Sequence, residues 1–298
     1  MKDKIVIGTW PISGDWGPID TKSTINILEQ AYFKYGFKEF DTAPNYGNGF
    51  SEFILGKIFY NQKDVVFNTK VGSQSFGGKS FEIDDIKRSV NESLQRLNCQ
   101  KINTIYLHNP RSEITNYDKV LNLLSDYKSQ KIIRYIGLSC AKNYDYSEIL
   151  NNVEFDFIQD DINLLSLSPL KKLNKQKIYA RSPLASGLLS GRINKNTVFN
   201  KSDHRAEWLK GERLISICKR LDVLRNISPQ TTIIDLALRF MHHNKEVYKT
   251  IYGIKKINHL NNLIRLIKLP PLTNSEIKSI YKAFNNDYGL YDEKHLAY

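Results

Sequence analysis

Three ionisable side chains and a phenol lie at or just after the ends of apolar runs in the N-terminal part of the chain. Asp41 and Tyr46 are five residues apart in FDTAPNYG (40–47), Lys70 ends VVFNTK, and His108 lies near the end of NTIYLHN. A phenol has a pKa near 10, and a neighbouring ammonium group stabilises its phenolate. We therefore expect Lys70 to lower the pKa of Tyr46, and Asp41 to pair with Lys70 and keep it protonated.

These four residues predict proton transfer. Tyr46 would be a general acid that points into a cavity, and His108 would orient a carbonyl oxygen or help to pass the proton. One polar residue at a strand end often marks only the point where the strand meets solvent, but four such residues favour a site. Because no cysteine or serine has a base partner in an evident motif, we expect a hydride carrier to provide the nucleophile.

The elements that position these residues alternate between short apolar runs and helical patterns, which is typical of a parallel α/β sheet. We predict an α/β fold, a (β/α)8 TIM barrel, as a single domain over residues 1–298, with 285–298 as a C-terminal tail. The predicted strands cover residues 5–10, 39–43, 65–70, 103–109, 133–139, 155–161, 177–183 and 248–254. Polar residues or glycine at the strand ends are Thr9, Asp41, Lys70, His108, Ser139, Gln159, Arg181 and Gly253, with Trp10 beside Thr9.

The helical pattern over 229–243 begins after Ser228, which is predicted as its cap, with Pro229 in the first turn. The histidines at 242 and 243 on this helix are predicted to be surface residues. His204 has no partner in the sequence pattern. Trp10, Trp16, Tyr46 and Phe76 are expected to form an aromatic wall of the pocket.

Composition limits the possible partners. The chain has 298 residues, 41% hydrophobic and 25% charged, with a formal net charge of +12. Its lysines are spread along the chain, which argues against nucleic acid, although the charge would attract a phosphorylated small molecule. No apolar run indicates a membrane span and no signal-peptide pattern is visible, so we expect a cytoplasmic protein. We also expect a monomer or a weak homo-oligomer. Cys99, Cys140 and Cys218 lack metal-site spacing, so free thiols and no metal are expected.

The order and spacing of these residues resemble the aldo-keto reductase family between residue 5 and about 265. FDTAPNYG resembles the Asp-Thr-Ala-x-x-Tyr-Gly signature of that family, NTKVG its lysine strand and LHNP its histidine strand. IGLS and FIQDDIN resemble the nicotinamide-side strands, and SPLASGLLSG the loop after the seventh strand. The resemblance implies NAD(P)H-dependent reduction of an aldehyde or ketone, with sugars among the candidates. Hydride would come from nicotinamide C4 and a proton from Tyr46.

The resemblance also implies a cofactor site for NADP, with NAD as an alternative. Ser139 and Gln159 would hold the carboxamide, and Arg181 replaces an aromatic residue that stacks on the nicotinamide, where it can stack or bind an anionic substrate. Cys140 stands where the family usually has asparagine. The other residues implied to contact the cofactor are Thr9, Trp10, Asp41, Ser182, Leu184, Ser186, Gly253, Lys255, Lys256, His259 and Asn262. His259 and Asn262 depart from the common family residues.

Two alternatives remain open. Lys70 can form a Schiff base in a lyase or aldolase on the same barrel. The chain can also be a non-catalytic NADP-binding sensor or auxiliary subunit. Asp41 argues against the first, because it keeps Lys70 protonated, and the presence of all four proton-transfer residues argues against the second.

Overall fold

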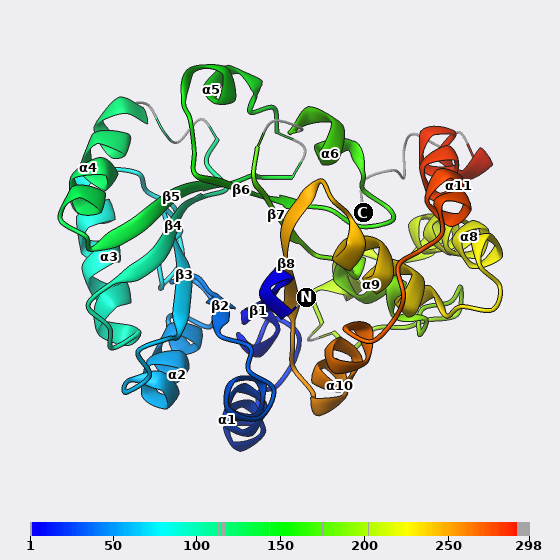
Figure 1. Ribbon diagram of the computed structural model, residues 1–298, viewed down its shortest axis with the longest axis horizontal. Helices are drawn as coiled ribbons and strands as arrows, with labels where there is room; N and C mark the ends of the chain where they lie inside the picture. The colour runs from blue at the N-terminus through cyan, green and yellow to red at the C-terminus, as the bar shows by residue number, and fades with distance from the viewer. Residues whose placement is uncertain are drawn as a thin grey trace.

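Eight parallel strands form a closed barrel in sequence order (Figure 1). The computed structural model describes residues 2–111, 114, 117–142, 144–173, 176–201 and 203–290. The predicted (β/α)8 barrel is confirmed as a single domain. The strands are β1 Ile5–Gly8, β2 Glu39–Asp41, β3 Val66–Val71, β4 Ile102–His108, β5 Ile133–Ser139, β6 Phe157–Asp161, β7 Ile178–Arg181 and β8 Val247–Gly253.

Helices surround the barrel and pack their apolar faces against it (Figure 1). In α3, for example, Ile86 and Val90 are four residues apart and fully buried, and Asp84 and Asp85 lie in the first turn, where the helix dipole favours acids. The described helices are α1 Thr21–Glu29, α2 Phe50–Phe59, α3 Ile83–Arg96, α4 Tyr117–Ser129, α5 Ser147–Asn152, α6 Ser168–Lys172, α7 Arg205–Trp208, α8 Gly211–Ile227, α9 Ile233–His243, α10 Ile257–Leu266 and α11 Asn274–Asn285.

Side chains fill the barrel interior, so the barrel is a packed core and not a pore. One interior cluster consists of Val6, Tyr106, Phe157, Tyr179 and Ile251. Glu39 is the first residue of β2, and its buried carboxylate accepts hydrogen bonds from Asn68 (2.8 Å) and the Tyr179 hydroxyl (3.0 Å). This carboxylate also pairs with Lys249. These contacts close the N-terminal end of the barrel, which leaves the C-terminal end for a site.

The strand register brings the predicted strand-end residues to one level. Gly8 pairs with Asp41, His108 with Ser139, and Ser139 with Gln159. Asp161 and Arg181 pair in the same way between β6 and β7. Because all strands are parallel, these side chains share the C-terminal rim.

Several element boundaries differ from those predicted. β1 ends at Gly8, and Trp10 begins a short 3-10 turn over Trp10–Ile12. The predicted cap Ser228 is wrong, because α9 begins at Ile233 and Thr232 caps it by accepting from the Asp235 N–H (3.2 Å). Thr232 can cap because its extended backbone points the hydroxyl into the first turn.

The prediction that His242 is a surface residue is also wrong. His242 is 2% exposed, because it lies on the apolar face of α9, whereas His243 is half-buried. The predicted tail begins where α11 ends, at Asn285, and continues into a short turn at Asp287–Gly289. Arg220 on α8 holds this turn through Asp287 (2.8 Å). Residues 291–298 of the tail lie outside the described residues.

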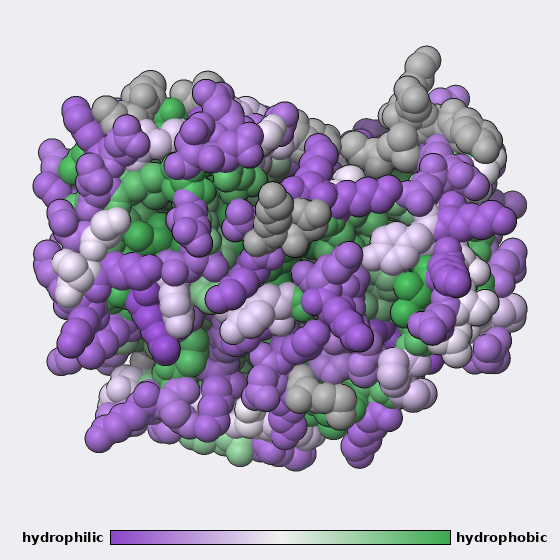
Figure 2. All heavy atoms as spheres, turned by 45° about the horizontal axis from the view of Figure 1, so that its top comes forward, coloured by the Kyte–Doolittle hydropathy of each residue, from purple (hydrophilic) through white to green (hydrophobic). Residues whose placement is uncertain are grey.

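The surface carries most of the polar side chains, as Figure 2 shows for one face, with apolar side chains between them in limited areas. None of the helices in the described ranges is long and apolar enough to span a bilayer. All three cysteines are free thiols.

Candidate active site

A buried ion pair lies at the centre of the C-terminal rim. Lys70 Nζ is 2.7 Å from Asp41 Oδ1 and also donates to the Thr42 carbonyl oxygen (2.6 Å). The Lys70 and Asp41 side chains are 1% and 5% exposed. Burial lowers the pKa of Lys70, but the charges of Asp41 and Tyr46 outweigh burial and raise this pKa overall. Lys70 therefore carries its positive charge at neutral pH, as expected from the sequence.

Tyr46 follows β2 on a turn and is half-buried, with Lys70 Nζ 4.8 Å from the centre of its ring. Burial raises the pKa of Tyr46. The positive charges of Lys70 and Arg181 lower this pKa and the negative charge of Asp41 raises it, so that it is raised overall. The expected net lowering of this pKa is thus wrong, because burial outweighs the neighbouring cation. The phenol keeps its proton at neutral pH, and Lys70 is close enough to stabilise the phenolate when the proton leaves.

His108 lies beside the phenol at the end of β4. Its ring centre is 6.2 Å from that of Tyr46, and the two rings are nearly perpendicular. Burial lowers the pKa of His108 well below its usual value, and the charges of Lys70 and Arg181 lower it further. A neutral imidazole has one N–H donor and one acceptor nitrogen. The buried Nδ1 atom has no hydrogen-bond partner in the described part of the chain, so His108 can orient a carbonyl oxygen.

Gln159 and Ser139 offer complementary groups on β6 and β5. Gln159 Nε2 donates to Asp41 Oδ2 (2.5 Å), whereas its buried Oε1 has no hydrogen-bond partner among the described residues. The Ser139 hydroxyl accepts from Arg181 Nη1 (3.0 Å) and still has its own O–H to donate. One donor and one acceptor match a primary amide, so these residues fit the carboxamide of a nicotinamide.

Arg181 connects the ends of four neighbouring strands. Its guanidinium donates to Ser139 Oγ, to Asn109 Oδ1 (3.2 Å) and to the Cys140 carbonyl oxygen. Arg181 Nε lies 3.2 Å from Asp161 Oδ1. Sequence reasoning missed Asn109 and Asp161, although the adjacent acids at the end of β6 were a visible signal. Asp161 balances the charge of Arg181, and the contacts of Arg181 hold these strand ends together.

The loop after β7 has an unusual backbone. Ser182, Ala185 and Ser186 have φ of 54°, 50° and 54°, and Gly187 has φ of 88°. Non-glycine residues rarely adopt positive φ, and strain of this kind gathers at functional sites. Leu184 has φ of −103° and precedes the run of three left-handed residues from 185 to 187. The contacts of this loop with a pyrophosphate group stay a prediction.

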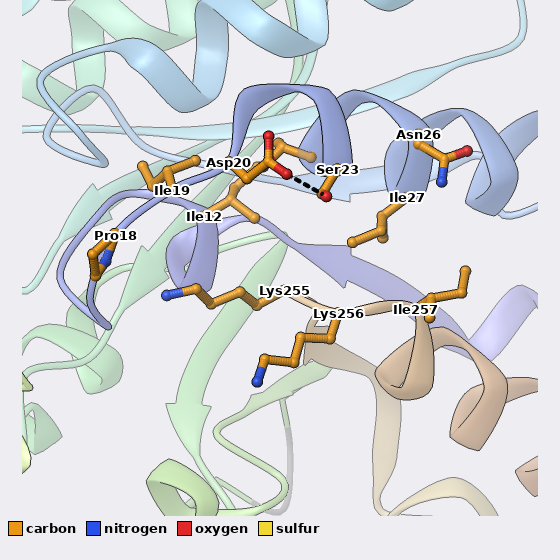
Figure 3. A pocket seen from close by; sticks show the side chains of 11 residues that line it. Ile12, Pro18, Ile19, Asp20, Ser23, Asn26, Ile27, Lys255, Lys256 and Ile257 are labelled. Carbon is orange, nitrogen blue, oxygen red and sulfur yellow. Dashed lines mark hydrogen bonds between the residues drawn. The ribbon is translucent and has the colours of Figure 1, made fainter.

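The turn between β8 and α10 has two differently directed lysines. The Lys255 ammonium donates to the carbonyl oxygens of Trp16 (2.6 Å) and Gly17 (3.0 Å), whereas Lys256 points another way (Figure 3). A cavity of 370 Å³ lies between this turn and the start of α1. A Cβ atom on Gly253 would lie 2.6 Å from Pro11 Cγ, so glycine is needed there for packing.

The remaining predicted residues are placed as follows. His259 Nδ1 accepts from the Lys255 N–H (3.2 Å), and Asn262 Oδ1 lies 3.5 Å from Arg265 on the same helix. The Thr9 hydroxyl donates to the Asp41 carbonyl oxygen (3.0 Å). The structure thus gathers the strand-end residues at one site, and the adenosine contacts of the β8–α10 turn stay a prediction.

An aromatic wall adjoins Tyr46. Trp10 lies 6.4 Å from the Tyr46 ring, and Trp16 lies 5.2 Å from Trp10. His204 completes the wall from the β7 loop, 5.7 Å from Trp10 and 4.4 Å from Trp16. Sequence reasoning missed His204, since nothing near it in sequence signals this contact. Phe76 is 89% exposed and does not pack into the wall.

A closed (β/α)8 barrel with a tyrosine, a lysine–aspartate pair and a histidine at its C-terminal rim is the arrangement of an aldo-keto reductase. The chain belongs to the aldo/keto reductase family, whose model matches residues 4–285. This is a family of oxidoreductases that use nicotinamide cofactors and act on carbonyl compounds.

Several known proteins are similar to this chain over most of its length. L-galactose dehydrogenase of Arabidopsis thaliana is 24% identical, covering 94% of this chain and 90% of its own. The NADH-specific methylglyoxal reductase of Escherichia coli is 28% identical, with coverage of 83% and 84%. A probable voltage-gated potassium channel subunit beta of Arabidopsis thaliana is 25% identical, with coverage of 89% and 87%. The structure of a glycerol dehydrogenase from Gluconobacter oxydans superposes with a TM-score of 0.78 at 23% identity, covering 94% and 90% of the two chains, which supports the fold.

Proposed function

We propose that this protein reduces an aldehyde or ketone to an alcohol with a nicotinamide dinucleotide, and that Tyr46 donates the proton. The observation that carries the proposal is the position of the Lys70 ammonium, 4.8 Å from the Tyr46 ring centre and paired with the buried Asp41. A phenol with a raised pKa is a poor acid on its own. It becomes a useful general acid where a cation stabilises the phenolate that it leaves behind.

Each residue has a defined part in this reaction. Asp41 keeps Lys70 charged and in place, and Lys70 stabilises the Tyr46 phenolate. The neutral His108 hydrogen-bonds the carbonyl oxygen and holds it near the Tyr46 hydroxyl. Ser139 and Gln159 hold the carboxamide of the cofactor. When bound, the nicotinamide supplies a hydride to the carbonyl carbon.

The cofactor is proposed to be NADPH in preference to NADH. Lys256 on the β8–α10 turn and the N-terminus of α10 at Ile257 favour an additional phosphate. Lys255 can contribute charge only if it leaves the carbonyl oxygens of loop 10–20. Fluorescence titration with both cofactors tests this choice. A tenfold lower Kd for NADH than for NADPH would contradict it.

Replacement of Tyr46 by phenylalanine tests the proton donor. Tyr46→Phe removes one hydroxyl and keeps the ring beside Lys70, so we expect kcat to fall about 100- to 10,000-fold with the Kd for NADPH within twofold of the wild type. Turnover of a panel of aldehydes, sugars and keto acids measures the first quantity and fluorescence titration the second. Substantial residual turnover in this variant would remove Tyr46 from its role.

A second candidate function is a cofactor-binding auxiliary subunit. The similarity to channel beta subunits favours this candidate, because their chains match over a comparable length. It predicts tight NADPH binding with no turnover of any carbonyl compound in the panel. The presence of the complete set Asp41, Tyr46, Lys70 and His108 supports the enzyme instead.

The Schiff-base alternative is disfavoured by the charge state of Lys70. An amine must be neutral to attack a carbonyl carbon, and the pKa of Lys70 is raised by Asp41 and Tyr46 despite its burial. Borohydride treatment in the presence of substrate should therefore leave Lys70 unmodified. A covalent adduct on Lys70, detected by mass spectrometry, would support the lyase or aldolase.

A further inference from the structure

The β7 loop is fastened to the loop between β1 and α1 next to the active site. Trp16 and Asp203 form an antiparallel bridge. Arg205 donates to both carboxylate oxygens of Asp203, at 2.9 Å and 2.6 Å, and its guanidinium lies 5.1 Å from the Trp16 ring centre. Arg205 Nη1 also donates to the Ser186 carbonyl oxygen (3.1 Å), in the loop that directly follows β7. These contacts fix the backbone on both sides of His204.

His204 is surrounded by all three tryptophans of the chain. Its ring centre is 4.4 Å from Trp16, 5.7 Å from Trp10 and 6.4 Å from Trp208. Trp10 in turn lies 6.4 Å from Tyr46. His204 is therefore separated from the proton donor by one aromatic neighbour, Trp10.

The His204 side chain is 30% exposed, so part of its ring is accessible, but one of its ring nitrogens lacks a hydrogen bond. The buried Nδ1 atom has no hydrogen-bond partner in the described ranges and lies 4.0 Å from Asp203 Oδ1, beyond hydrogen-bond distance. The indole N–H of Trp16 is likewise buried without a partner among these residues. A buried polar atom without a hydrogen bond costs stability, so a bound molecule that supplied such a bond would gain affinity here.

We propose that His204 is a specificity-determining residue that hydrogen-bonds a hydroxyl group of the substrate while Trp10 and Trp16 contact its carbon chain. The substrate class is then a hydroxylated carbonyl compound, not a purely apolar aldehyde. This assignment rests on the carbonyl-reducing function proposed above. A site that hydrogen-bonds a substrate hydroxyl discriminates against an analogue without it, because its polar group is then left unpaired.

The test compares two aldehydes of equal chain length, D-erythrose and butanal. For His204→Phe we expect the ratio of kcat/KM for erythrose to that for butanal to fall about 3- to 10-fold. His204→Gln, which keeps hydrogen-bonding groups, should restore part of this ratio. His243→Phe is the matched control, because His243 is half-buried and lies on α9, and it should leave the ratio unchanged.

Binding measurements separate this inference from the proposed function. All three tryptophans lie beside His204, so intrinsic fluorescence reports on its surroundings. In Tyr46→Phe loaded with NADPH, addition of His204→Phe should raise the Kd for erythrose relative to butanal by a similar factor. If His204→Phe lowered kcat/KM equally for both aldehydes, or if the erythrose-to-butanal ratios of kcat/KM and of Kd were unchanged, the role of His204 would be overturned. Absence of turnover in the wild type, with this binding preference retained, would overturn only the proposed reaction.

Discussion

Replacement of Lys70 by methionine tests the buried ion pair directly. Lys70→Met keeps an unbranched apolar side chain of similar length but leaves the Asp41 carboxylate, 5% exposed, with only the Gln159 amide as a side-chain partner. Removing one member of a buried pair costs about 3 to 5 kcal/mol, because the other charge stays buried and unpaired. The loss of folding free energy should be near the upper end of this range, because Lys70 also donates to the Thr42 carbonyl oxygen at 2.6 Å.

Urea denaturation at neutral pH, followed by circular dichroism, measures this loss as a lower midpoint with an unchanged m-value. The double variant Asp41→Asn/Lys70→Met should be at least about 2 kcal/mol more stable than Lys70→Met, because no unpaired carboxylate remains. Lys57→Met, at an exposed position on α2, is the control and should change stability by less than about 0.5 kcal/mol. If Lys70→Met lost less than about 1 kcal/mol, or if the double variant were no more stable, the reasoning would be refuted.

Two further predictions concern pH. Burial lowers the pKa of His242 to about 4, so its contribution to stability is complete above pH 6.5 and is lost as the pH falls towards 4. The expected loss of stability is about 3 kcal/mol. His242→Gln should make the free energy of unfolding less dependent on pH over this range, and a pH dependence equal to that of the wild type would contradict this. Burial raises the pKa of Asp160 to about 6, so its ionisation destabilises the fold as the pH rises above 4. Asp160→Asn should therefore be about 3 kcal/mol more stable than the wild type at pH 8 but equal to it at pH 3 in urea denaturation, and an equal or lower stability at pH 8 would exclude this.

The barrel and the proton-transfer residues could be predicted from the sequence because both depend on order along the chain. Alternating strands and helices favour a parallel barrel, and in a parallel barrel successive strand ends meet at one rim. Asp41, Lys70 and His108 had to lie close together once their strands were placed. Their pairing then followed from charge, as the 2.7 Å contact between Lys70 and Asp41 confirms.

Burial could not be predicted in the same way. The sequence indicated a cation near Tyr46, but the sign of the pKa shift depends on how much protein surrounds the phenol, and that amount is a sum over many distant residues. His242 was misjudged for a related reason. An adjacent pair of histidines does not reveal which one lies on the apolar face of α9.

Sequence order and residue type by themselves determined the barrel, its strand-end chemistry and the family resemblance, because these depend on local periodicity and on a regular topology. The tertiary structure alone decided the contacts of the long loops. His204 meets Trp10 and Trp16, and Lys255 binds the carbonyl oxygens of Trp16 and Gly17, across large separations in sequence. Loops follow no repeating pattern, so their contacts depend on the shape of the whole rim and not on neighbouring residues.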